Sequence, residues 1–198
     1  GADIGLWTVN GVTSMQRTFK EATVFNQNLN PWVMPLVTNT QSMFNSAESF
    51  NNGLAPGAQG TLDWTLPSLE EAADRPRGMF QQARDFNCNI LQIDWSGVRE
   101  FEFLCRGAHS FNNGGVGLNG LAQYFQADKF YTFGAMLHTT SYDAPLDEWG
   151  PALAEMAGYT MNATLYGVPY DYSLESWDIR PCTSMGNMSG KTMSRENW

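Results

Sequence analysis

Apolar, small and polar residues recur along the chain in one fixed order. In the clearest copy, residues 22–32, two residues separate each successive member of the series Ala, Phe-Asn, Leu and Trp. Six copies in 198 residues predict a repeat protein, in which each unit packs on its neighbours. The other copies begin with a small residue, at Ala47, Ala83, Ala108, Thr139 and Gly167.

The spacing of apolar residues within a unit predicts one short helix and one short strand. Met15, Phe19 and Ala22 lie at positions i, i+4 and i+7, which form one face of a helix. The stretch around residues 28–30 is expected to be a short strand. We therefore predict a leucine-rich-repeat-like α/β solenoid, with one short strand and one short helix per unit of about 25 residues. Helices are expected at residues 15–22, 40–47, 98–105 and 151–156.

The pattern predicts a single solenoid domain over residues 1–198, with about six repeats. Irregular insertions interrupt it at residues 55–63, which are rich in Gly and Pro, and at residues 113–136. Residues 3–7 match the second half of a unit, and residues 177–188 match the first half of one. We therefore expect the chain to be a segment of a longer array, or a partner to cover its ends, because the end units of a solenoid expose apolar edges.

The repeat resembles a known family. The pattern W-x-V-x-x-V-T-S-M-x-x-x-F-x-x-A-x-x-F-N-x-x-L, complete at residues 7–29, is similar to the BspA-like repeats of mycoplasma lipoproteins and bacterial surface proteins, which are also found in algae and protists. The resemblance covers essentially the whole chain and is weaker over residues 118–170. It implies a curved solenoid at the cell surface or secreted, with a role in binding or adhesion and not in catalysis.

Two neighbouring repeat positions hold an aromatic residue followed by Asn or Asp. Equivalent side chains in stacked units lie one above another, so we predict a buried aromatic ladder and an Asn ladder that bonds the turn backbone. The alternatives are an aromatic platform for bases or sugars and a row of Ca²⁺ ligands, although Ca²⁺ sites need several carboxylates per ion. The Trp positions are open to either core or contact surface. The ladder residues are Phe25, Phe50, Phe86, Phe111, Tyr142, Tyr170, Asn26, Asn51, Asn87, Asn112, Asp143 and Asp171.

The second insertion carries the candidate partner-binding residues Tyr124, Phe125, Phe130, Tyr131 and Phe133. It interrupts the repeat, so packing between units does not require it, and aromatic side chains are enriched at binding hot spots. The alternative is a private core beneath a long loop.

The net charge of the chain argues against some classes of binding partner. The net charge is −9, from 11 Lys and Arg against 20 Asp and Glu, which argues against nucleic acid and against electrostatic docking to an anionic membrane. No apolar run approaches the roughly 20 residues that span a bilayer. No targeting segment is visible in this chain.

The sequence contains few residues of the types that catalyse reactions, bind metals or become modified. The two histidines, His109 and His138, have no metal-ligand spacing and belong to no nucleophile motif, so we expect no metal, no cofactor and no catalytic residue. The three cysteines are an odd number, which favours free thiols over complete pairing. Sequons at Asn162 and Asn187 would permit glycosylation in a secretory setting.

These observations favour a non-catalytic protein-interaction scaffold of the BspA-like type, acting in surface binding or adhesion. A second hypothesis is a fixed structural subunit of a larger assembly, such as a membrane-associated complex in an algal organelle. A third is a carbohydrate-active enzyme built on a solenoid, which would need clustered carboxylates in a cleft. A scaffold is soluble and monodisperse by itself, whereas a subunit co-purifies stoichiometrically with its assembly.

Overall fold

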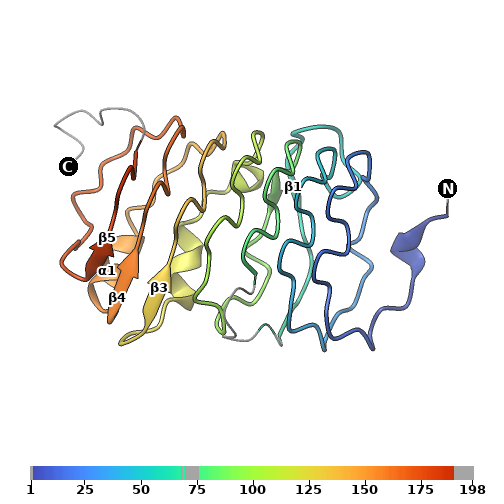
Figure 1. The fold of residues 1–198 in the computed structure, drawn as a ribbon, viewed down its shortest axis with the longest axis horizontal. Coiled ribbons are helices and arrows are strands. Elements are labelled where there is room, and N and C mark those ends of the chain that lie inside the picture. Colours follow the sequence, from blue (N-terminus) through green and yellow to red (C-terminus); the bar gives the residue numbers. More distant parts are fainter. Residues whose placement is uncertain (1, 68, 70–75, 190–198) are drawn as a thin grey trace.

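The fold comes from a computed structural model, which describes residues 2–67, 69 and 76–189. Successive passes of the chain lie side by side, and their order along the long axis of the molecule follows their order in the sequence (Figure 1). Backbone hydrogen bonds join each pass to the next, as between Met15 and Asn39.

Most of the described chain is turn and loop, with short regular elements. The described residues form two parallel sheets (Figure 1). One sheet contains β1 (Gly60–Thr61) and β2 (Cys88–Asn89), and the other contains β3 (Phe130–Thr132), β4 (Gly158–Thr160) and β5 (Cys182–Ser184). Gly60 pairs with Cys88 in the first sheet, and Phe130 pairs with Gly158 in the second. In chain order the elements are η1 (Ile4–Leu6), β1 (Gly60–Thr61), β2 (Cys88–Asn89), η2 (Asn113–Gly115), η3 (Asn119–Tyr124), β3 (Phe130–Thr132), α1 (Trp149–Ala154), β4 (Gly158–Thr160) and β5 (Cys182–Ser184), the η elements being 3₁₀ helices.

The predicted fold class is wrong. A leucine-rich-repeat-like α/β solenoid needs a strand and a helix in each unit, and α1 is the single α-helix among the described residues. It overlaps the helix expected at residues 151–156. The helices expected at residues 15–22, 40–47 and 98–105 are series of turns, and residues 28–30 form no strand.

Backbone conformation explains why these helices do not form. Arg17 and Glu21 have positive φ angles of 58° and 64°, outside the right-handed helical region. The N–H of Arg17 donates across to the carbonyl of Gln41 at 3.0 Å, while the N–H of Lys20 donates back to Arg17 at 3.1 Å. Alternate N–H groups thus bond to the neighbouring unit and the others close tight turns. The i, i+4 spacing of apolar residues fits this turn series as well as it fits a helix.

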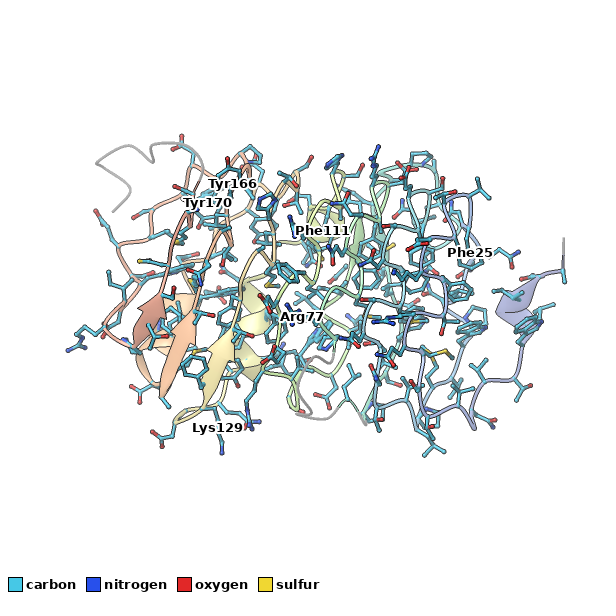
Figure 2. All side chains as sticks on the ribbon, viewed as in Figure 1. Phe25, Arg77, Phe111, Lys129, Tyr166 and Tyr170 are labelled. Carbon is cyan, nitrogen blue, oxygen red and sulfur yellow. The ribbon has the colours of Figure 1, made fainter. Side chains whose placement is uncertain are left out.

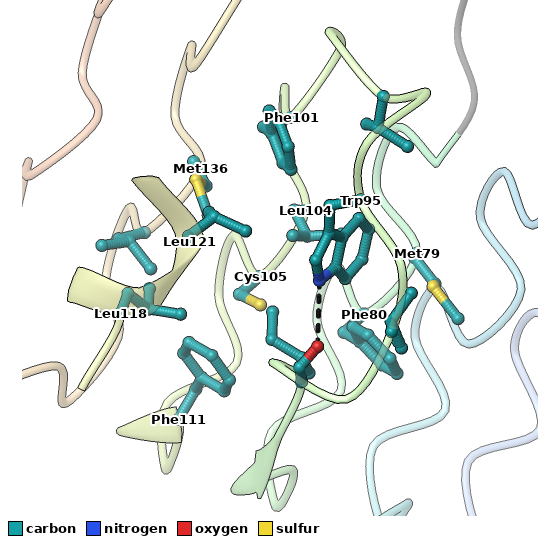
Figure 3. Packing of buried hydrophobic residues seen from close by; sticks show 14 of the residues in the cluster. Met79, Phe80, Trp95, Phe101, Leu104, Cys105, Phe111, Leu118, Leu121 and Met136 are labelled. Carbon is teal, nitrogen blue, oxygen red and sulfur yellow. Dashed lines mark hydrogen bonds between the residues drawn. The ribbon is translucent and has the colours of Figure 1, made fainter. Parts of the chain in front are cut away.

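The core contains two parallel stacks of aromatic rings. Phe19, Phe44 and Phe80 form one stack, with centroid separations of 5.3 and 5.7 Å. A second stack lies beside it, and Phe44 is only 3.8 Å from Phe50 in that stack. Figure 3 shows where this pattern changes: the unit after Phe80 holds Cys105 at the equivalent position, with Leu104 in the same buried cluster. The rings are buried by their neighbours in the next unit and by each other.

The Trp residues link successive units by hydrogen bonds as well as by packing. The Nε1–H of Trp64 donates to the carbonyl of Leu29 at 2.9 Å, and that of Trp177 donates to Leu146 at the same distance. Trp95 bonds instead to Ile90 within its own unit (Figure 3). These indoles are almost completely buried, whereas Trp7 is 59% exposed. Most of the Trp positions therefore belong to the core.

Candidate functional site

The aromatic ladder residues fall into two groups. Phe25, Phe50, Phe86 and Phe111 stack with centroid separations of 5.9, 5.9 and 5.8 Å and interplanar angles of 10° or less. Phe25 and Phe111 mark the ends of this stack in Figure 2. The structure leaves no open face on Phe50, Phe86 or Phe111, each of which is fully buried. Inside the core, these rings have no access to a base or a sugar.

The Tyr members of the ladder have a different role. The hydroxyl of Tyr142 accepts a hydrogen bond from the N–H of Leu118 at 2.9 Å, and that of Tyr170 accepts from Leu146 at 3.2 Å. Neither ring stacks on the Phe series. Because the phenol lies among buried groups, burial raises the pKa of Tyr170 to about 12. These tyrosines remain neutral donors and acceptors between units.

The repeat pattern did not indicate the residues that accept the hydrogen bond from a buried N–H in units where the ladder holds Phe. Asn52 accepts from the N–H of Leu29 at 2.8 Å, and Asn113 accepts from Ile90 at 2.9 Å. A signal was present, since Phe-Asn-Asn occurs in these two units and Tyr-Asp in the later ones. The Tyr hydroxyl thus replaces the second Asn as acceptor for a buried N–H.

The first four members of the Asn ladder bond from unit to unit. Oδ1 of Asn26 accepts from the N–H of Asn51, Oδ1 of Asn51 accepts from Asn87, and Oδ1 of Asn87 accepts from Asn112, at 2.7–2.8 Å. Asn112 in turn accepts from the N–H of Asp143 at 3.0 Å. The amide oxygens that would face a cation are directed at backbone donors.

The candidate partner-binding residues do not form one exposed surface. Tyr131 and Phe133 are fully buried, and their rings stack 5.9 Å apart. Tyr124 and Phe125 are half-buried and pack against the core. Phe130 is 47% exposed and lies over Gly158 of β4. The insertion is thus largely a local core, with Phe130 as its exposed aromatic side chain.

A groove of about 340 Å³ crosses three successive units next to this insertion. It is lined by ten residues from the segments 102–106, 132–138 and 160–163, among them Thr132 and Thr160 at the paired ends of β3 and β4. Its lining includes residues with little or no side chain, namely Gly134, Ala135 and Ala163. Thr132 also lines the groove, and its buried Oγ1 makes no hydrogen bond to a described residue.

One wall of the groove carries cationic and aromatic side chains. The guanidinium carbon of Arg77 lies 4.9 Å from the centre of the Phe103 ring, and that of Arg106 lies 5.3 Å from the same ring. Arg77 also pairs with Glu102 at 3.1 Å. Because a guanidinium over an aromatic face is attracted to its negative potential, this arrangement holds both cations in place.

A row of neighbouring positions across successive units begins at Arg106. The backbone N–H of Gly107 bonds to His138, and that of Thr139 bonds to Tyr166, so the Arg106, His138 and Tyr166 positions are neighbours. The His138 ring stacks on Tyr166, with centroids 4.9 Å apart. Partial burial, and then the nearby charge of Arg106, lower the pKa of His138 below its ordinary value. Figure 2 shows Tyr166 toward the C-terminal units from Arg77.

Comparison with known proteins gives a family. The family model described as "Mycoplasma protein of unknown function, DUF285" matches residues 1–74 and 77–197. The chain belongs to this family. No curated protein and no solved structure gives a significant match to it. The DUF285 match agrees with mycoplasma-type repeats, while the narrower BspA-like assignment is not confirmed by it.

The remaining chemical groups of this DUF285 protein are dispersed. Over residues 2–67, 69 and 76–189, no three His, Cys, Asp or Glu side chains gather in a way that could hold a metal ion. In the same part of the chain, no helix is long and apolar enough to cross a membrane. Cys88, Cys105 and Cys182 are free thiols, and the first two are buried. The groove brings charged and aromatic side chains together, including Arg106, Phe103 and His138.

Proposed function

We propose that this DUF285 protein is a non-catalytic scaffold that binds another protein through the groove across residues 102–106, 132–138 and 160–163. The observation that carries the proposal is the presence of Arg106, Phe103 and the His138–Tyr166 pair on one partly open surface. Arg and aromatic residues are the types most enriched in the energetic centres of protein interfaces. We expect no chemical reaction to take place in the groove.

The resemblance to BspA-like repeats supports a place for the scaffold at the cell surface or outside the cell. In that setting the molecule would take part in attachment to another protein. The stacked units support the same role, since consecutive units present a continuous surface on which substitutions can change the partner without changing the core. The buried rings of the core contribute stability, and the groove contributes recognition.

Site-specific crosslinking tests the proposal. A photo-crosslinking phenylalanine derivative in place of Tyr166, which is 42% exposed beside the groove, is expected to capture a partner in cells that express the native protein. The matched control carries the same group in place of Val116, which is 65% exposed and does not line the groove. Crosslinks from Tyr166 alone support the proposal.

Two other outcomes contradict it. If neither position crosslinks to a protein, the groove is not a protein-binding surface. If both positions crosslink to the same proteins at fixed stoichiometry, the chain is a structural subunit of a larger assembly. Mass spectrometry of the crosslinked products separates these cases.

A further inference from the structure

Arg106 is the cationic side chain that lines the groove. Its guanidinium stacks on Phe103, and no acidic side chain of the described residues pairs with it. Arg77, whose guanidinium also lies over this ring, is already paired with Glu102. In a chain with a net charge of −9, acidic groups are abundant, so an unpaired Arg in a groove is available for an external anion. A guanidinium matches a carboxylate in shape and can donate two parallel hydrogen bonds to it.

Phe103 occupies a position that does not favour an aromatic residue. Its φ angle is +59°, a left-handed conformation that is unusual for a bulky side chain. The turn requires this conformation in every unit, but it does not require a phenyl ring. Strained positions that persist without a structural need are candidates for function. The equivalent positions in the other units hold Arg17, Ser42, Gly78, Ala135, Ala163 and Asn187.

Further donors surround the space in front of Arg106. His138 lies in the next unit along the same row. The Oδ1 atom of Asn162 accepts from Ser184 and Gly186, so its Nδ2 group remains as a donor. Glu102 is the one acidic residue that lines the groove, and its charge is balanced by Arg77.

We propose that the groove recognises a carboxylate side chain in an acidic peptide segment of the protein partner, with Arg106 as the binding residue and Phe103 as the positioning residue. This inference rests on the proposed scaffold function and specifies its ligand. Charge complementarity favours an acidic segment, because the groove offers an unpaired cation on a protein that otherwise repels acidic partners. Tyr166 and His138 offer a flat surface beside the carboxylate for the rest of the segment.

Titration with defined peptides tests the inference. The probes are acetyl-Ala-Glu-Ala-Glu-Ala-amide, the same peptide with Gln in place of Glu, and glucuronic acid. Binding is followed by amide shifts of Gly134 and Ala135 in ¹⁵N-labelled full-length chain. The Glu peptide is expected to shift these resonances with saturation, and the Gln peptide is not. Equal effects of both peptides overturn carboxylate recognition, and binding of glucuronic acid alone overturns the peptide assignment in favour of an acidic sugar.

Three variants assign the roles of individual residues. Arg106→Gln is expected to raise the dissociation constant of the Glu peptide at least tenfold. Arg17→Gln, the control, removes an exposed Arg outside the groove and should bind as the wild type does. Phe103→Ala is expected to fold normally, because Ala135 and Ala163 have the same turn conformation, and to bind more weakly without any loss of melting temperature. Wild-type affinity in Arg106→Gln overturns the inference.

The crosslinking experiment separates this inference from the scaffold function. If Arg106→Gln still crosslinks its partner at Tyr166 with undiminished yield, the scaffold stands and carboxylate recognition fails. If the Glu peptide binds but no partner crosslinks at Tyr166, the groove is an acid-binding site and the protein-scaffold proposal fails. If Arg106→Gln loses both binding of the Glu peptide and crosslinking at Tyr166, the result supports the two proposals together.

Discussion

Replacing Phe50 by Ala should remove a ring that stacks on three others in the core. Phe50 is fully buried, and its ring stacks on Phe44 at 3.8 Å and on Phe25 and Phe86 at 5.9 Å each. Truncation of a buried Phe costs about 3–5 kcal/mol, from lost transfer energy and from the cavity that remains. The upper part of this range is expected here, because stacked aromatic pairs add about 0.5–1.5 kcal/mol each beyond their buried area.

The measurement is urea unfolding of the purified chain, followed by circular dichroism and tryptophan fluorescence. For a chain of this size a loss of about 3–5 kcal/mol lowers the melting temperature by about 6–20 °C. Two matched variants calibrate the result. Phe25→Ala should cost less, because Phe25 is half-buried at the end of the stack, and Phe130→Ala should change stability by less than about 0.5 kcal/mol, because Phe130 is 47% exposed.

The same experiment can refute the reasoning. If Phe50→Ala unfolds within about 1 kcal/mol of the wild type, the stacked rings do not determine stability. Equal losses in Phe50→Ala and Phe25→Ala would show that the position of a ring within the stack has no effect. The first result would mean that backbone hydrogen bonds between units stabilise the protein more than its aromatic core.

Three further predictions concern hydrogen bonds and thiols. Asn87→Ala should destabilise the protein by about 1–3 kcal/mol in urea unfolding, because it leaves buried backbone groups without partners. A chelator should leave the melting temperature of the wild type unchanged, and a drop of several degrees would instead support a bound cation. Tyr142→Phe keeps the ring but removes the acceptor for a buried N–H, so a loss of about 1–3 kcal/mol is expected, and unchanged stability would deny that role. At pH 8, a thiol reagent should label Cys182 first and reach Cys88 and Cys105 only after unfolding, since burial raises the pKa of Cys88 to about 12 and that of Cys105 well above its ordinary value; three thiols reacting at one rate would contradict this.

Some features of this protein follow from its sequence alone. The period of the repeat places Phe25, Phe50, Phe86 and Phe111 at equivalent positions, and equivalent positions in stacked units lie one above another. The same argument places the Asn residues in a row. Periodicity is a property of the chain itself, so it is visible without coordinates.

Other features depend on tertiary contacts. Met15 and Phe19 have helical spacing, but their segment is a series of turns because its N–H groups bond to carbonyls in the next unit. Sequence spacing does not reveal which acceptor an N–H will use. The replacement of an Asn acceptor by the Tyr142 hydroxyl is likewise apparent only when Leu118 lies beside it.

The groove is decided wholly by the tertiary structure. Arg106, His138 and Tyr166 are far apart in the sequence and share no motif, yet the stacking of three units makes them neighbours. The sequence marked the aromatic insertion as the contact site instead, because it shows which residues are aromatic but not which are covered. Burial of Tyr131 and Phe133, and exposure of the row beside them, result from packing between units that no single stretch of sequence contains.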